Sequence, residues 1–587
     1  MRRALVAFVG ALVVMLTVVV PPAFAVAGSV ELAASEPIVD LGDAVTIEGT
    51  LTSSAGCTEG RSLFLEWRAA DSAVFATVAQ GTTAIDGTFT FEQVQQYTGR
   101  YRVTATADGS CDVVLSDTAL VRVRARVDST LLAGSLEAGS CVDVTAAVTP
   151  ARPGQTVELQ QRAGEGWSTL QTLTLDGNSQ AVARPCFGWQ DVGVVRLRVR
   201  WPAQDEVNET GTGPTLPFQI ELAAWMRRIE ELVAGRAMSV SVGEESTFLY
   251  GHAPEAARTP ASNEKLLLSM ALLDAFGPDE RIRTWAASAQ GAVEGRLEGD
   301  LWILGRGDPE VDRGTMADLA ARVADSGITR IDGHVIGSTT YFRRDWDAQG
   351  WNDIARDYVA RPTALVFDGN LDAHGRDVRS PERRAAEVLT EELERIGVRV
   401  TRRPDAGRPP EDLVNVTSVR SRSLRAILAK LLRPSDNFYA EVLGKRLGVA
   451  EAGSPGTIAK GAAAVEDWVD ATADFDLFDC SGLSYANRVT AEGIVRLLWV
   501  AEAAPWGQDL FDVLPSGGQG TLRHRFATVD VRAKTGTLTD ISALSGWVWL
   551  ERTQTWGEFS ILSSGLSKST ASELEDRIVR ILQNLAR

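Results

Sequence analysis

The chain has 587 residues, of which 44% are hydrophobic and 23% are charged. This length exceeds what one hydrophobic core supports, and the composition is ordinary for globular domains, so we expect about three or four folded units. The formal net charge of -18 argues against a polyanionic partner such as nucleic acid or an acidic bilayer surface.

The N-terminus has the pattern of a secretory signal peptide. Two arginines precede an apolar run from Ala4 to Val20, and two prolines and the small-x-small string Ala23-Phe24-Ala25 follow it. We expect residues 1–25 to be a signal peptide and the mature chain to be exported to the extracellular side, the cell wall or the periplasmic space. Because the apolar run is nearly long enough to span a bilayer, an uncleaved membrane anchor is the alternative.

Residues 28–125 and 126–218 are predicted to form two tandem all-β, immunoglobulin-like sandwiches. Short alternating segments separated by Gly, Asp, Ser and Pro turns fill both ranges, and neither range has a helical period. Segments of the first range, such as Val45-Thr46-Ile47, have counterparts such as Val142-Asp143-Val144 in the second, which indicates an internal repeat. We expect a spacer, with contact to the cell wall or to another protein as the alternative.

Four of the five cysteines lie in these two ranges, and an exported chain is expected to oxidise them. Four cysteines allow three pairings. The predicted strand order favours the Cys57–Cys111 and Cys141–Cys186 pairs, because the two members of each pair fall at one end of a sandwich. The fifth, Cys480, is expected to be a small buried residue.

From residue 222 the pattern changes to α/β, and residues 222–587 are predicted to form one α/β domain. The segments Met238–Val242 and Thr247–Tyr250 alternate as a hairpin, and Lys265–Phe276 is an apolar helix that Gly277 ends. Three further strands are predicted over Val531–Leu538, Ala543–Leu550 and Glu558–Ser563. A final amphipathic helix should cover the sheet that these strands form with the early hairpin.

Residues from about 284 to 420 are predicted to be an inserted subdomain. This range holds strands of its own, such as Gly299–Leu304, and short helices. The Pro- and Arg-rich segment Arg402–Pro410 is expected to be a loop, and Leu424–Leu432 restarts a buried helix that Pro434 ends.

Two of the six lysines fall within a three-part motif. Its parts are Ser262-Asn263-Glu264-Lys265, Ser435-Asp436-Asn437 and Lys534-Thr535-Gly536, which follow the order S-x-x-K, S-D-N and K-T-G. Each part is a weak signal alone. The ordered set is typical of penicillin-binding proteins and class A β-lactamases.

Ser262 is the predicted nucleophile and Lys265 its base. Two residues that are three positions apart lie on one face of a helix, so their side chains can form a hydrogen bond. Burial of the helix should lower the pKa of Lys265 and supply a neutral amine that takes the Ser262 proton. Arginine cannot replace this lysine, because a guanidinium keeps its proton. We therefore expect Lys265→Arg to abolish acylation by a fluorescent penicillin and Lys445→Arg to leave acylation nearly unchanged.

The S-D-N motif is predicted to lie at a junction between two helices. Asp436 can cap the second helix, while Ser435 and Asn437 point into a cleft. Ser435 can relay a proton to the leaving amine. Asn437 can hold both the substrate peptide bond and the Lys265 ammonium, because an amide offers an acceptor and donors.

The K-T-G motif is predicted to lie on a strand that faces substrate at a sheet edge. Lys534 and the Thr535 hydroxyl would hold a terminal carboxylate, and Gly536 would leave room for substrate backbone beside the strand. The backbone N–H groups of Ser262 and Thr537 are the predicted oxyanion hole. The four histidines have neither metal-ligand spacing nor a serine-elbow context, so we expect no metal and no cofactor.

Residues from about 225 to 587 resemble the class C low-molecular-mass penicillin-binding proteins, which are D-alanyl-D-alanine carboxypeptidases and endopeptidases. The resemblance is carried by Pro260–Leu266, Gly305–Pro309, Ser435–Glu441, Asp479–Ser484, Asn487–Thr490, Gly520–Leu522 and Ala533–Leu538. Two departures are that Cys480 stands where the family usually has glycine and that Ser262 and Ser435 are closer in sequence than the family pattern. The inserted region should therefore be trimmed. The tandem sandwiches are not part of the usual pattern.

The resemblance implies a β-lactamase/transpeptidase-like fold and a serine-type DD-peptidase. Such an enzyme cleaves the terminal D-Ala, or a D-Ala-containing crosslink, of peptidoglycan stem peptides through an acyl-enzyme on Ser262, and β-lactams acylate it. Carboxypeptidase or endopeptidase preference and oligomeric state stay open. The alternatives are a β-lactamase or esterase and a non-catalytic wall-binding protein. No E-x-x-L-N pattern follows the S-D-N motif, which argues against a class A β-lactamase.

Overall fold

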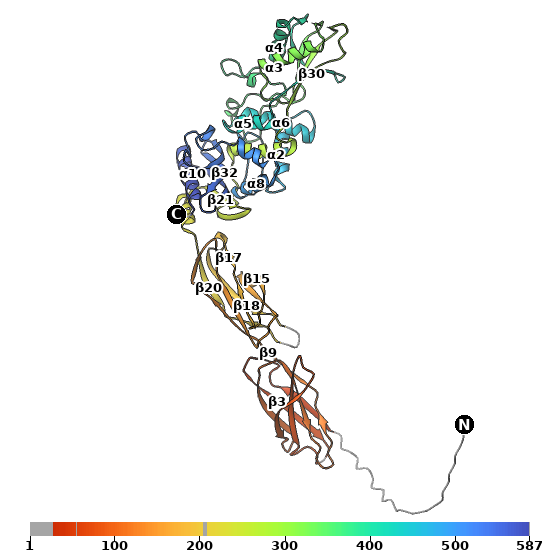
Figure 1. Ribbon diagram of the computed structural model, residues 1–587, viewed down its shortest axis with the longest axis vertical. Coiled ribbons are helices and arrows are strands. Elements are labelled where there is room, and N and C mark those ends of the chain that lie inside the picture. Colours follow the sequence, from red (N-terminus) through yellow and green to blue (C-terminus); the bar gives the residue numbers. More distant parts are fainter. Residues whose placement is uncertain (1–27, 55, 204–207, 586–587) are drawn as a thin grey trace, which may run out of the picture. The chain divides into compact units, whose positions relative to one another are not determined.

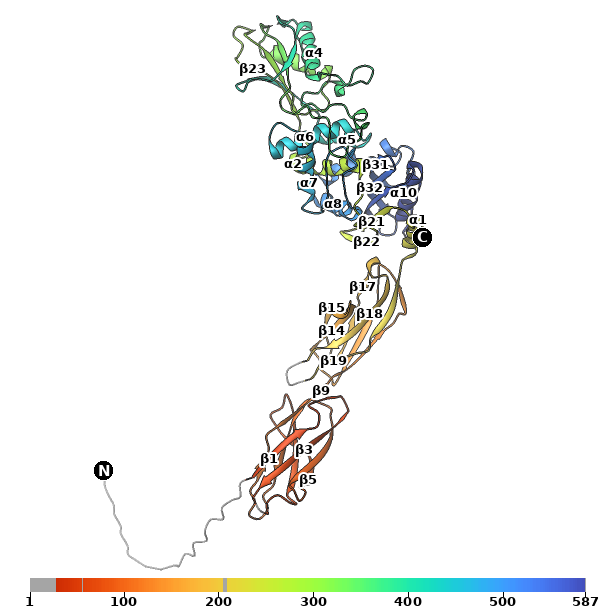
Figure 2. The ribbon, with the colours of Figure 1, turned by 180° about the vertical axis from the view of Figure 1, so that it is seen from behind.

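The computed structural model describes residues 28–585, except residues 55 and 204–207. The predicted signal peptide lies outside the described residues. Within the described part of the chain, no helix combines the length and apolarity that a membrane span requires. The chain divides into two compact units, one of Met1–Phe187 with Asp191–Glu221 and one of Gly188–Gln190 with Leu222–Arg587 (Figures 1 and 2).

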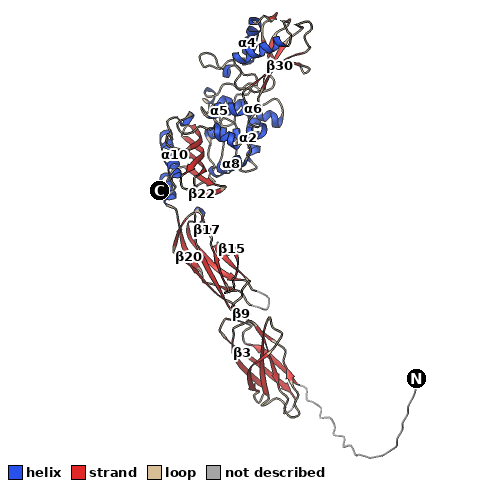
Figure 3. Cartoon of the chain, viewed as in Figure 1, coloured by secondary structure: helices blue, strands red, loops and turns tan. Residues whose placement is uncertain are grey.

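The first unit begins with a two-sheet β-sandwich (Figure 3). One sheet is β1 (Gly28–Ala34), β3 (Ala44–Ser53) and β6 (Thr88–Val94), and the other is β2 (Ile38–Asp40), β9 (Ala119–Arg124), β7 (Gly99–Ala105), β4 (Ser62–Ala69) and β5 (Ala76–Thr82), with β8 (Val114–Leu115) beside β7. Alternate residues of both sheets, such as Ile47 and Val103, form one apolar core.

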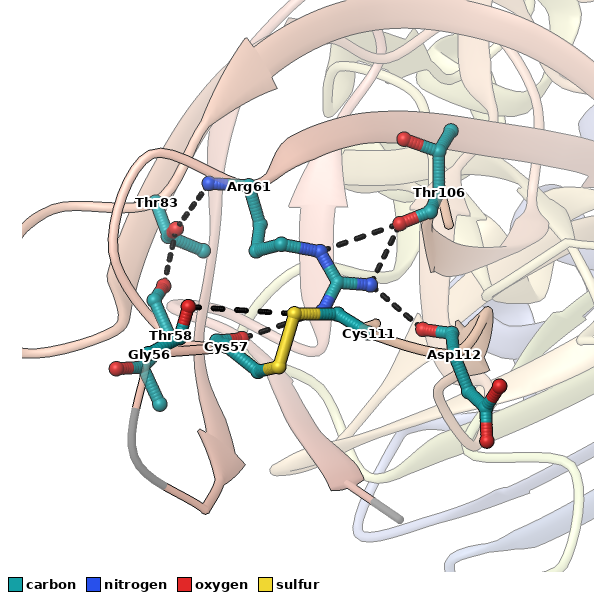
Figure 4. The surroundings of a disulfide bond; sticks show 8 residues. All are labelled: Gly56, Cys57, Thr58, Arg61, Thr83, Thr106, Cys111 and Asp112. Atoms are coloured by element: carbon teal, nitrogen blue, oxygen red, sulfur yellow. Dashed lines mark hydrogen bonds between the residues drawn. A yellow bond between two sulfur atoms is a disulfide. The ribbon is translucent and has the colours of Figure 1, made fainter. Parts of the chain in front are cut away.

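Arg61 holds together the end of this sandwich that carries the Cys57–Cys111 disulfide (Figure 4). The residue is only 2% exposed, and its guanidinium donates hydrogen bonds to the backbone carbonyls of Cys57 at 3.2 Å, Thr106 at 2.5 Å and Asp112 at 2.6 Å. A buried cation is tolerated where its donors are satisfied, so three loop segments are tied to one side chain.

The second sandwich repeats the arrangement with different strand lengths. Its sheets are β10 (Arg126–Leu131), β13 (Val144–Thr149) and β16 (Gln180–Ala183), and β11 (Ser135–Glu137), β20 (Leu216–Glu221), β18 (Gly193–Trp201), β14 (Thr156–Ala163) and β15 (Gly166–Thr174), with β19 (Gly211–Thr212) beside β18. The Cys141–Cys186 disulfide joins β12 (Ser140–Cys141) to β17 (Cys186–Phe187). Both disulfides have the pairing that the sequence favours.

The second unit contains a five-stranded antiparallel sheet. Its order is β22 (Thr247–His252), β21 (Met238–Glu244), β33 (Thr555–Ser564), β32 (Ile541–Leu550) and β31 (Val531–Leu538). The early hairpin and the last three strands therefore share one sheet, as predicted. Helix α10 (Lys568–Gln583), beside α1 (Ala224–Val233), packs on one face, and α8 (Ala491–Ala503) packs on the other (Figures 1 and 2).

Helix α2 (Glu264–Phe276) runs through the middle of a helical region, and its first ten residues are buried. The surrounding helices are α5 (Leu424–Leu432), α6 (Asn437–Ala452), α7 (Ile458–Val469), α8 and α9 (Gly507–Val513). A helix that is apolar on all sides must be enclosed, which accounts for the leucine-rich sequence of α2.

The inserted subdomain has its own sheet and core. The sheet order is β29 (Asp405–Gly407), β27 (Val335–Ser338), β25 (Leu301–Leu304), β23 (Arg283–Ser288) and β30 (Val414–Arg420), and α3 (Arg313–Asp325) and α4 (Pro381–Arg395) pack against it. A three-stranded sheet of β24 (Arg296–Leu297), β26 (Arg330–Ile331) and β28 (Arg399–Val400) lies beside them.

Two parts of the predicted inserted range differ from expectation. The segment Arg402–Pro410 is not all loop, because β29 inside it pairs in parallel with β27 at the edge of the sheet. Residues of the segment 342–366, such as Phe342 and Val366, pack against Phe438 and Val442 of α6. Part of the inserted range thus belongs to the core that supports the motif residues.

Candidate active site

Ser262 lies in the 3₁₀ turn η2 (Ala261–Asn263), directly before α2. The Nζ atom of Lys265 lies 2.9 Å from the Ser262 Oγ atom, so the predicted nucleophile and base are in contact. The turn is held in place on both sides: Ala261 adopts a φ of 47°, and the Asn263 side chain donates a 2.7 Å hydrogen bond to the Ser545 hydroxyl of β32. Strained backbone of this kind is common at functional sites.

Lys265 has no exposed surface, and its amine contacts only uncharged acceptors. Besides Ser262, these are the Asn437 Oδ1 atom at 2.7 Å and the Ser481 backbone carbonyl. Burial lowers the pKa of Lys265 to about 8, although the charge of Asp479 acts in the opposite direction. A substantial neutral fraction of this amine is therefore available near neutral pH to accept the Ser262 proton.

Ser435 and Lys534 form the second pair of the site. The Lys534 Nζ atom donates to the Ser435 Oγ atom at 2.7 Å and to the Thr535 backbone carbonyl at 2.7 Å. Burial, together with repulsion from Lys265, lowers the pKa of Lys534 well below its usual value. Asp436 caps α6 through a hydrogen bond from the Tyr439 backbone N–H, as the sequence predicts.

Gly536 is required where β31 packs against the turn that carries Ser262. A Cβ atom on this residue would lie 2.6 Å from the Pro260 carbonyl oxygen and 3.2 Å from the Ala261 Cβ atom. The glycine therefore lets β31 approach the turn that carries the nucleophile. Gly482 does the same from the other side, because its Cβ atom would lie 2.0 Å from the Ala261 carbonyl oxygen.

Thr535 and Thr537 differ in what their side chains can reach. The Thr535 residue is 8% exposed, and its hydroxyl forms a 2.8 Å hydrogen bond with the Thr521 hydroxyl. Thr537 is exposed and lines a cavity of about 360 Å³ together with Ser262 and Asn437. β31 is the edge strand of its sheet, so one side of its backbone is not paired within the sheet.

The walls of this cavity include residues that the motifs did not indicate. Asn352, Ile354 and Tyr358 come from the inserted range, and the Asn437 side chain donates a 3.0 Å hydrogen bond to the Tyr358 backbone carbonyl. Tyr485 also lines the cavity, and its hydroxyl accepts a 3.1 Å hydrogen bond from the Thr539 backbone N–H. No sequence motif marks these wall residues, because their positions at the cavity depend on how the inserted range packs against the motif residues.

Asp479 organises the loop beneath the site. Its fully buried carboxylate accepts six hydrogen bonds, between 2.8 and 3.0 Å, from the Trp351, Ser481 and Asn487 side chains and from the backbone N–H groups of Gly482, Leu483 and Ser484. These bonds fix the loop whose Ser481 carbonyl holds Lys265 and whose Gly482 packs on the nucleophile turn. The segment was noted in the sequence only as part of the resemblance.

Two further buried carboxyl groups lie near Lys265. Burial raises the pKa of Glu441 to about 7 and raises that of Glu264 well above its usual value, and repulsion from Asp479 adds to both. Glu441 accepts hydrogen bonds from the Cys480 backbone N–H at 3.0 Å and from the Ser481 backbone N–H at 2.8 Å. Neither group was singled out by sequence reasoning, because a carboxyl group on a helix is usually exposed.

The expectation that Lys445→Arg leaves acylation nearly unchanged stays a prediction, but the surroundings of Lys445 indicate that the same change should lower stability. Lys445 has no exposed surface, and its amine donates to the Asp345 carboxylate at 2.8 Å and to the backbone carbonyls of Arg343, Asp345 and Pro362 at 3.0 to 3.2 Å. A larger guanidinium does not fit this enclosed set of acceptors. Cys480, by contrast, is a free buried cysteine as predicted, and a Cβ atom on Gly444 would lie 2.3 Å from its sulfur.

Residues 219–375 and 372–585 match the D-Ala-D-Ala carboxypeptidase 3 (S13) family. These ranges cover more than half of the chain, so the chain belongs to this family of serine peptidases. The resemblance to the class C low-molecular-mass penicillin-binding proteins is thereby confirmed.

Similar proteins match between 54% and 61% of the chain. The D-alanyl-D-alanine carboxypeptidase of Actinomadura sp. (strain R39) is 29% identical, over 60% of this chain and 81% of that protein. Carboxypeptidase DacB of Mycolicibacterium smegmatis is also 29% identical, over 54% of this chain and 73% of that protein. The crystal structure of penicillin-binding protein 4 (dacB) from Haemophilus influenzae shares the fold, with a TM-score of 0.54 at 19% identity over 61% of this chain and 99% of that chain.

Proposed function

We propose that residues 222–587 are a serine-type D-alanyl-D-alanine peptidase that acts on peptidoglycan stem peptides through an acyl-enzyme on Ser262. The observation that carries this proposal is the 2.9 Å contact between the Ser262 Oγ atom and the Lys265 amine, which is buried and makes no contact with a carboxylate. Family membership supports the same reaction class. The complete set of motif side chains weighs against a non-catalytic wall-binding protein.

In the acylation step, the Ser262 Oγ atom attacks the carbonyl carbon of the penultimate D-Ala. Its proton passes to the neutral Lys265 amine, and the negative charge that develops on the carbonyl oxygen is held by the backbone N–H groups of Ser262 and Thr537. Asn437, which contacts Lys265 and lines the cavity, positions the substrate peptide bond.

Collapse of this intermediate breaks the C–N bond and releases the terminal D-Ala. The leaving amine needs one proton, which Ser435 relays from the Lys265 ammonium that formed when Ser262 attacked. Lys265 is then neutral again for the deacylation step, and Lys534 stays in contact with Ser435 and keeps its charge. Lys534 and the exposed Thr537 side chain hold the terminal carboxylate, since the Thr535 hydroxyl is engaged with Thr521. Water then hydrolyses the Ser262 ester and restores the serine.

A β-lactam presents the same carbonyl and carboxylate, so it should acylate Ser262 and remain bound. A β-lactamase is the alternative, and it requires a base that activates the deacylating water. The test is stopped-flow nitrocefin kinetics beside an assay for D-Ala release from a D-Ala-D-Ala peptide. We expect a burst of about one equivalent followed by slow turnover, because absence of a general base removes about 10² to 10⁴ in rate.

Rapid steady-state nitrocefin turnover without D-Ala release would contradict the peptidase assignment. Ser262→Ala, which should lose both the burst and D-Ala release, is the control. Mass spectrometry of the products from purified peptidoglycan then distinguishes carboxypeptidase from endopeptidase action. Loss of a terminal D-Ala indicates carboxypeptidase action, and cleaved crosslinks indicate endopeptidase action.

For the remainder of the chain, we propose a signal peptide over residues 1–25 and two immunoglobulin-like sandwiches over residues 28–125 and 126–218 that act as a spacer on an exported protein. The two-sheet strand order and one disulfide in each sandwich support this proposal. N-terminal sequencing of the secreted protein and non-reducing peptide mapping test it. Retention of the segment Ala4–Val20, or a Cys57–Cys141 linkage, would contradict the respective part.

A further inference from the structure

A second cavity, of about 350 Å³, lies where β23 begins and β30 ends, beside α6. Its lining is dominated by arginine: five guanidinium groups and one indole ring face it. These residues are Arg281, Arg283, Arg306, Arg420, Arg446 and Trp285. None of them belongs to the peptidase site described above.

The charge of this cavity is strongly positive in a chain whose net charge is -18. Its acidic lining residues are Asp279 and Glu280, so five positive and two negative groups leave a net charge of +3. Glu280 is already paired with Arg446 at 2.8 Å. Among the residues that the structure describes, no carboxylate forms an ion pair with the other four arginines.

Two of these arginines lie directly opposite each other. Arg283 of β23 and Arg420 of β30 are register partners in an antiparallel ladder, which places like charges on neighbouring positions of one sheet face. In the first sandwich, by contrast, an arginine at such a position faces a carboxylate. Glu66 of β4 is the register partner of Arg102 of β7 and forms a 2.8 Å ion pair with it. The Arg283–Arg420 pair has no such partner.

Arg306 is a third arginine of the cavity, and the structure shows no acceptor for its guanidinium among the described residues. Its neighbour Gly305 is required by fit, since a Cβ atom there would lie 2.4 Å from the Ala364 carbonyl oxygen. Arg306 itself is half-buried and stacks on Tyr341, with its guanidinium carbon 4.3 Å from the ring centroid. Within the described residues, its guanidinium makes no hydrogen bond to a protein acceptor, so the donors of a desolvated cation are left available.

We propose that this arginine cavity binds the phosphate group of an anionic ligand. A guanidinium presents its N–H groups in a fork that matches two oxygens of a phosphate, and several forks around one cavity can satisfy all of its oxygens. A single carboxylate would balance one of the three excess charges, whereas a phosphate monoester carries about -1.5 to -2 and a chain of phosphodiesters brings several charges together. The Trp285 ring has the Arg283 guanidinium over it, with the guanidinium carbon 5.4 Å from the ring centroid, and thereby holds this arginine at the cavity.

The test compares the binding of inorganic phosphate to the full-length protein and to two variants by calorimetry and thermal unfolding, at constant ionic strength set with chloride. Arg283→Gln/Arg420→Gln removes two guanidinium groups of the cavity and should weaken phosphate binding about tenfold or more. Arg399→Gln is the matched control, because Arg399 is an exposed arginine of the inserted subdomain outside the cavity. It should bind phosphate as the unchanged protein does.

A second readout separates ligand binding from a structural role. Without phosphate, the double variant should be at least as stable as the unchanged protein, because a like-charge pair has been removed. Lower stability in phosphate-free buffer, or phosphate affinity equal to that of the unchanged protein, would overturn the proposal. So would equal stabilisation by acetate, which would make the site a general anion site.

Two further probes distinguish the source of the phosphate. Glycerol 3-phosphate stands for a small phosphomonoester, and a poly(glycerol phosphate) chain stands for a phosphodiester polymer. Tighter binding of the chain at equal phosphate concentration assigns the site to a polymer, and equal or weaker binding assigns it to a small molecule. Failure of both probes and of inorganic phosphate overturns the proposal. Penicillin labelling of Ser262 is measured separately, so the peptidase assignment and the phosphate site can fail independently.

Discussion

Lys265 and Lys445 lie in two regions of the same unit and share a residue type and complete burial, but their surroundings differ. Lys445 is bound by the Asp345 carboxylate and by three backbone carbonyls, all within 3.2 Å. Lys265 contacts a hydroxyl, an amide oxygen and one backbone carbonyl, and no carboxylate touches it. The first set favours a permanent ammonium and the second a group that can lose its proton.

The comparison shows that burial alone does not make a base. Burial lowers the pKa of both lysines, but for Lys445 the direct contact with Asp345 acts against that shift. One helix serves both regions, since α6 begins with Asn437, which holds Lys265, and carries Lys445 two turns later. We infer that one buried lysine joins distant segments and that the other is suited to moving a proton.

The largest effect is expected for Lys265→Arg. The positive charge is kept but cannot be given up, so acylation by a fluorescent penicillin should fall by about 10² to 10⁴ in rate. Time-resolved labelling measures this rate, and thermal unfolding reports whether the variant is folded. Undiminished labelling of Lys265→Arg would remove this residue from the role of base.

Lys445→Met should lower the stability of the protein and leave its acylation rate nearly unchanged. Loss of the ammonium leaves the Asp345 carboxylate and three carbonyls without their donor, so the free energy of unfolding should drop by about 3 kcal/mol. Urea unfolding measures the drop. Lys430→Met is the matched control, because the Lys430 side chain is 57% exposed in a surface ion pair with Glu310, for which about 0 to 1 kcal/mol is expected.

The acylation rate of folded Lys445→Met should stay within a few-fold of the unchanged protein. A Lys445 variant that keeps its stability but loses labelling would reverse the distinction between the two lysines.

Asp479→Asn tests whether the loop under Lys265 must be held by a carboxylate. An amide offers one acceptor oxygen where six donors converge, so the loop that carries the Ser481 carbonyl should shift. Displacement of about 1 Å near reacting groups costs up to about 10² in rate, and we expect acylation to fall by about tenfold to 10²-fold. Asp476→Asn, an exposed carboxylate in the same segment, should change nothing.

The motif residues were predictable from the sequence because each must have one particular chemistry at a fixed local spacing. Ser262 and Lys265 had to share a helix face, and Asp436 had to cap α6, so the short patterns predict their contacts. The alternation of β31 and its neighbours likewise predicted the strands. That the early hairpin and the last three strands share one sheet was also predicted, since the apolar stripe of the final helix needs a sheet to cover.

Contacts between distant segments were not predictable in the same way. Lys445 and Asp345 are 100 positions apart, and nothing in the local pattern of α6 marks Lys445 as enclosed. The requirement for glycine at position 536 also depends on tertiary structure, because it comes from the close packing of β31 against the turn at Pro260. The same limit applies to the Arg283–Arg420 pair, whose register depends on how β30 returns to β23.

The smallest effect we expect is the pH dependence of acylation. Ser262 needs the neutral form of Lys265, whose pKa burial lowers to about 8, so the rate should rise with pH and approach a plateau above that value. Between pH 7 and pH 9 the neutral fraction grows about tenfold, and the acylation rate should follow it. The acidic groups that act on this amine are Asp479, Asp436, Glu441 and Glu264, and the charge of each raises the Lys265 pKa.

Glu441→Gln therefore sharpens the test. It removes a negative charge while its amide oxygen can still accept from the Cys480 and Ser481 backbone N–H groups, so the midpoint of the pH profile should move to lower pH. Asp476→Asn should leave the midpoint unchanged, since that carboxylate is exposed. Initial rates of penicillin labelling across pH 6 to 10 measure all three profiles. A rate that is flat or falling between pH 7 and pH 9 would mean that Lys265 is not the group whose deprotonation starts the reaction.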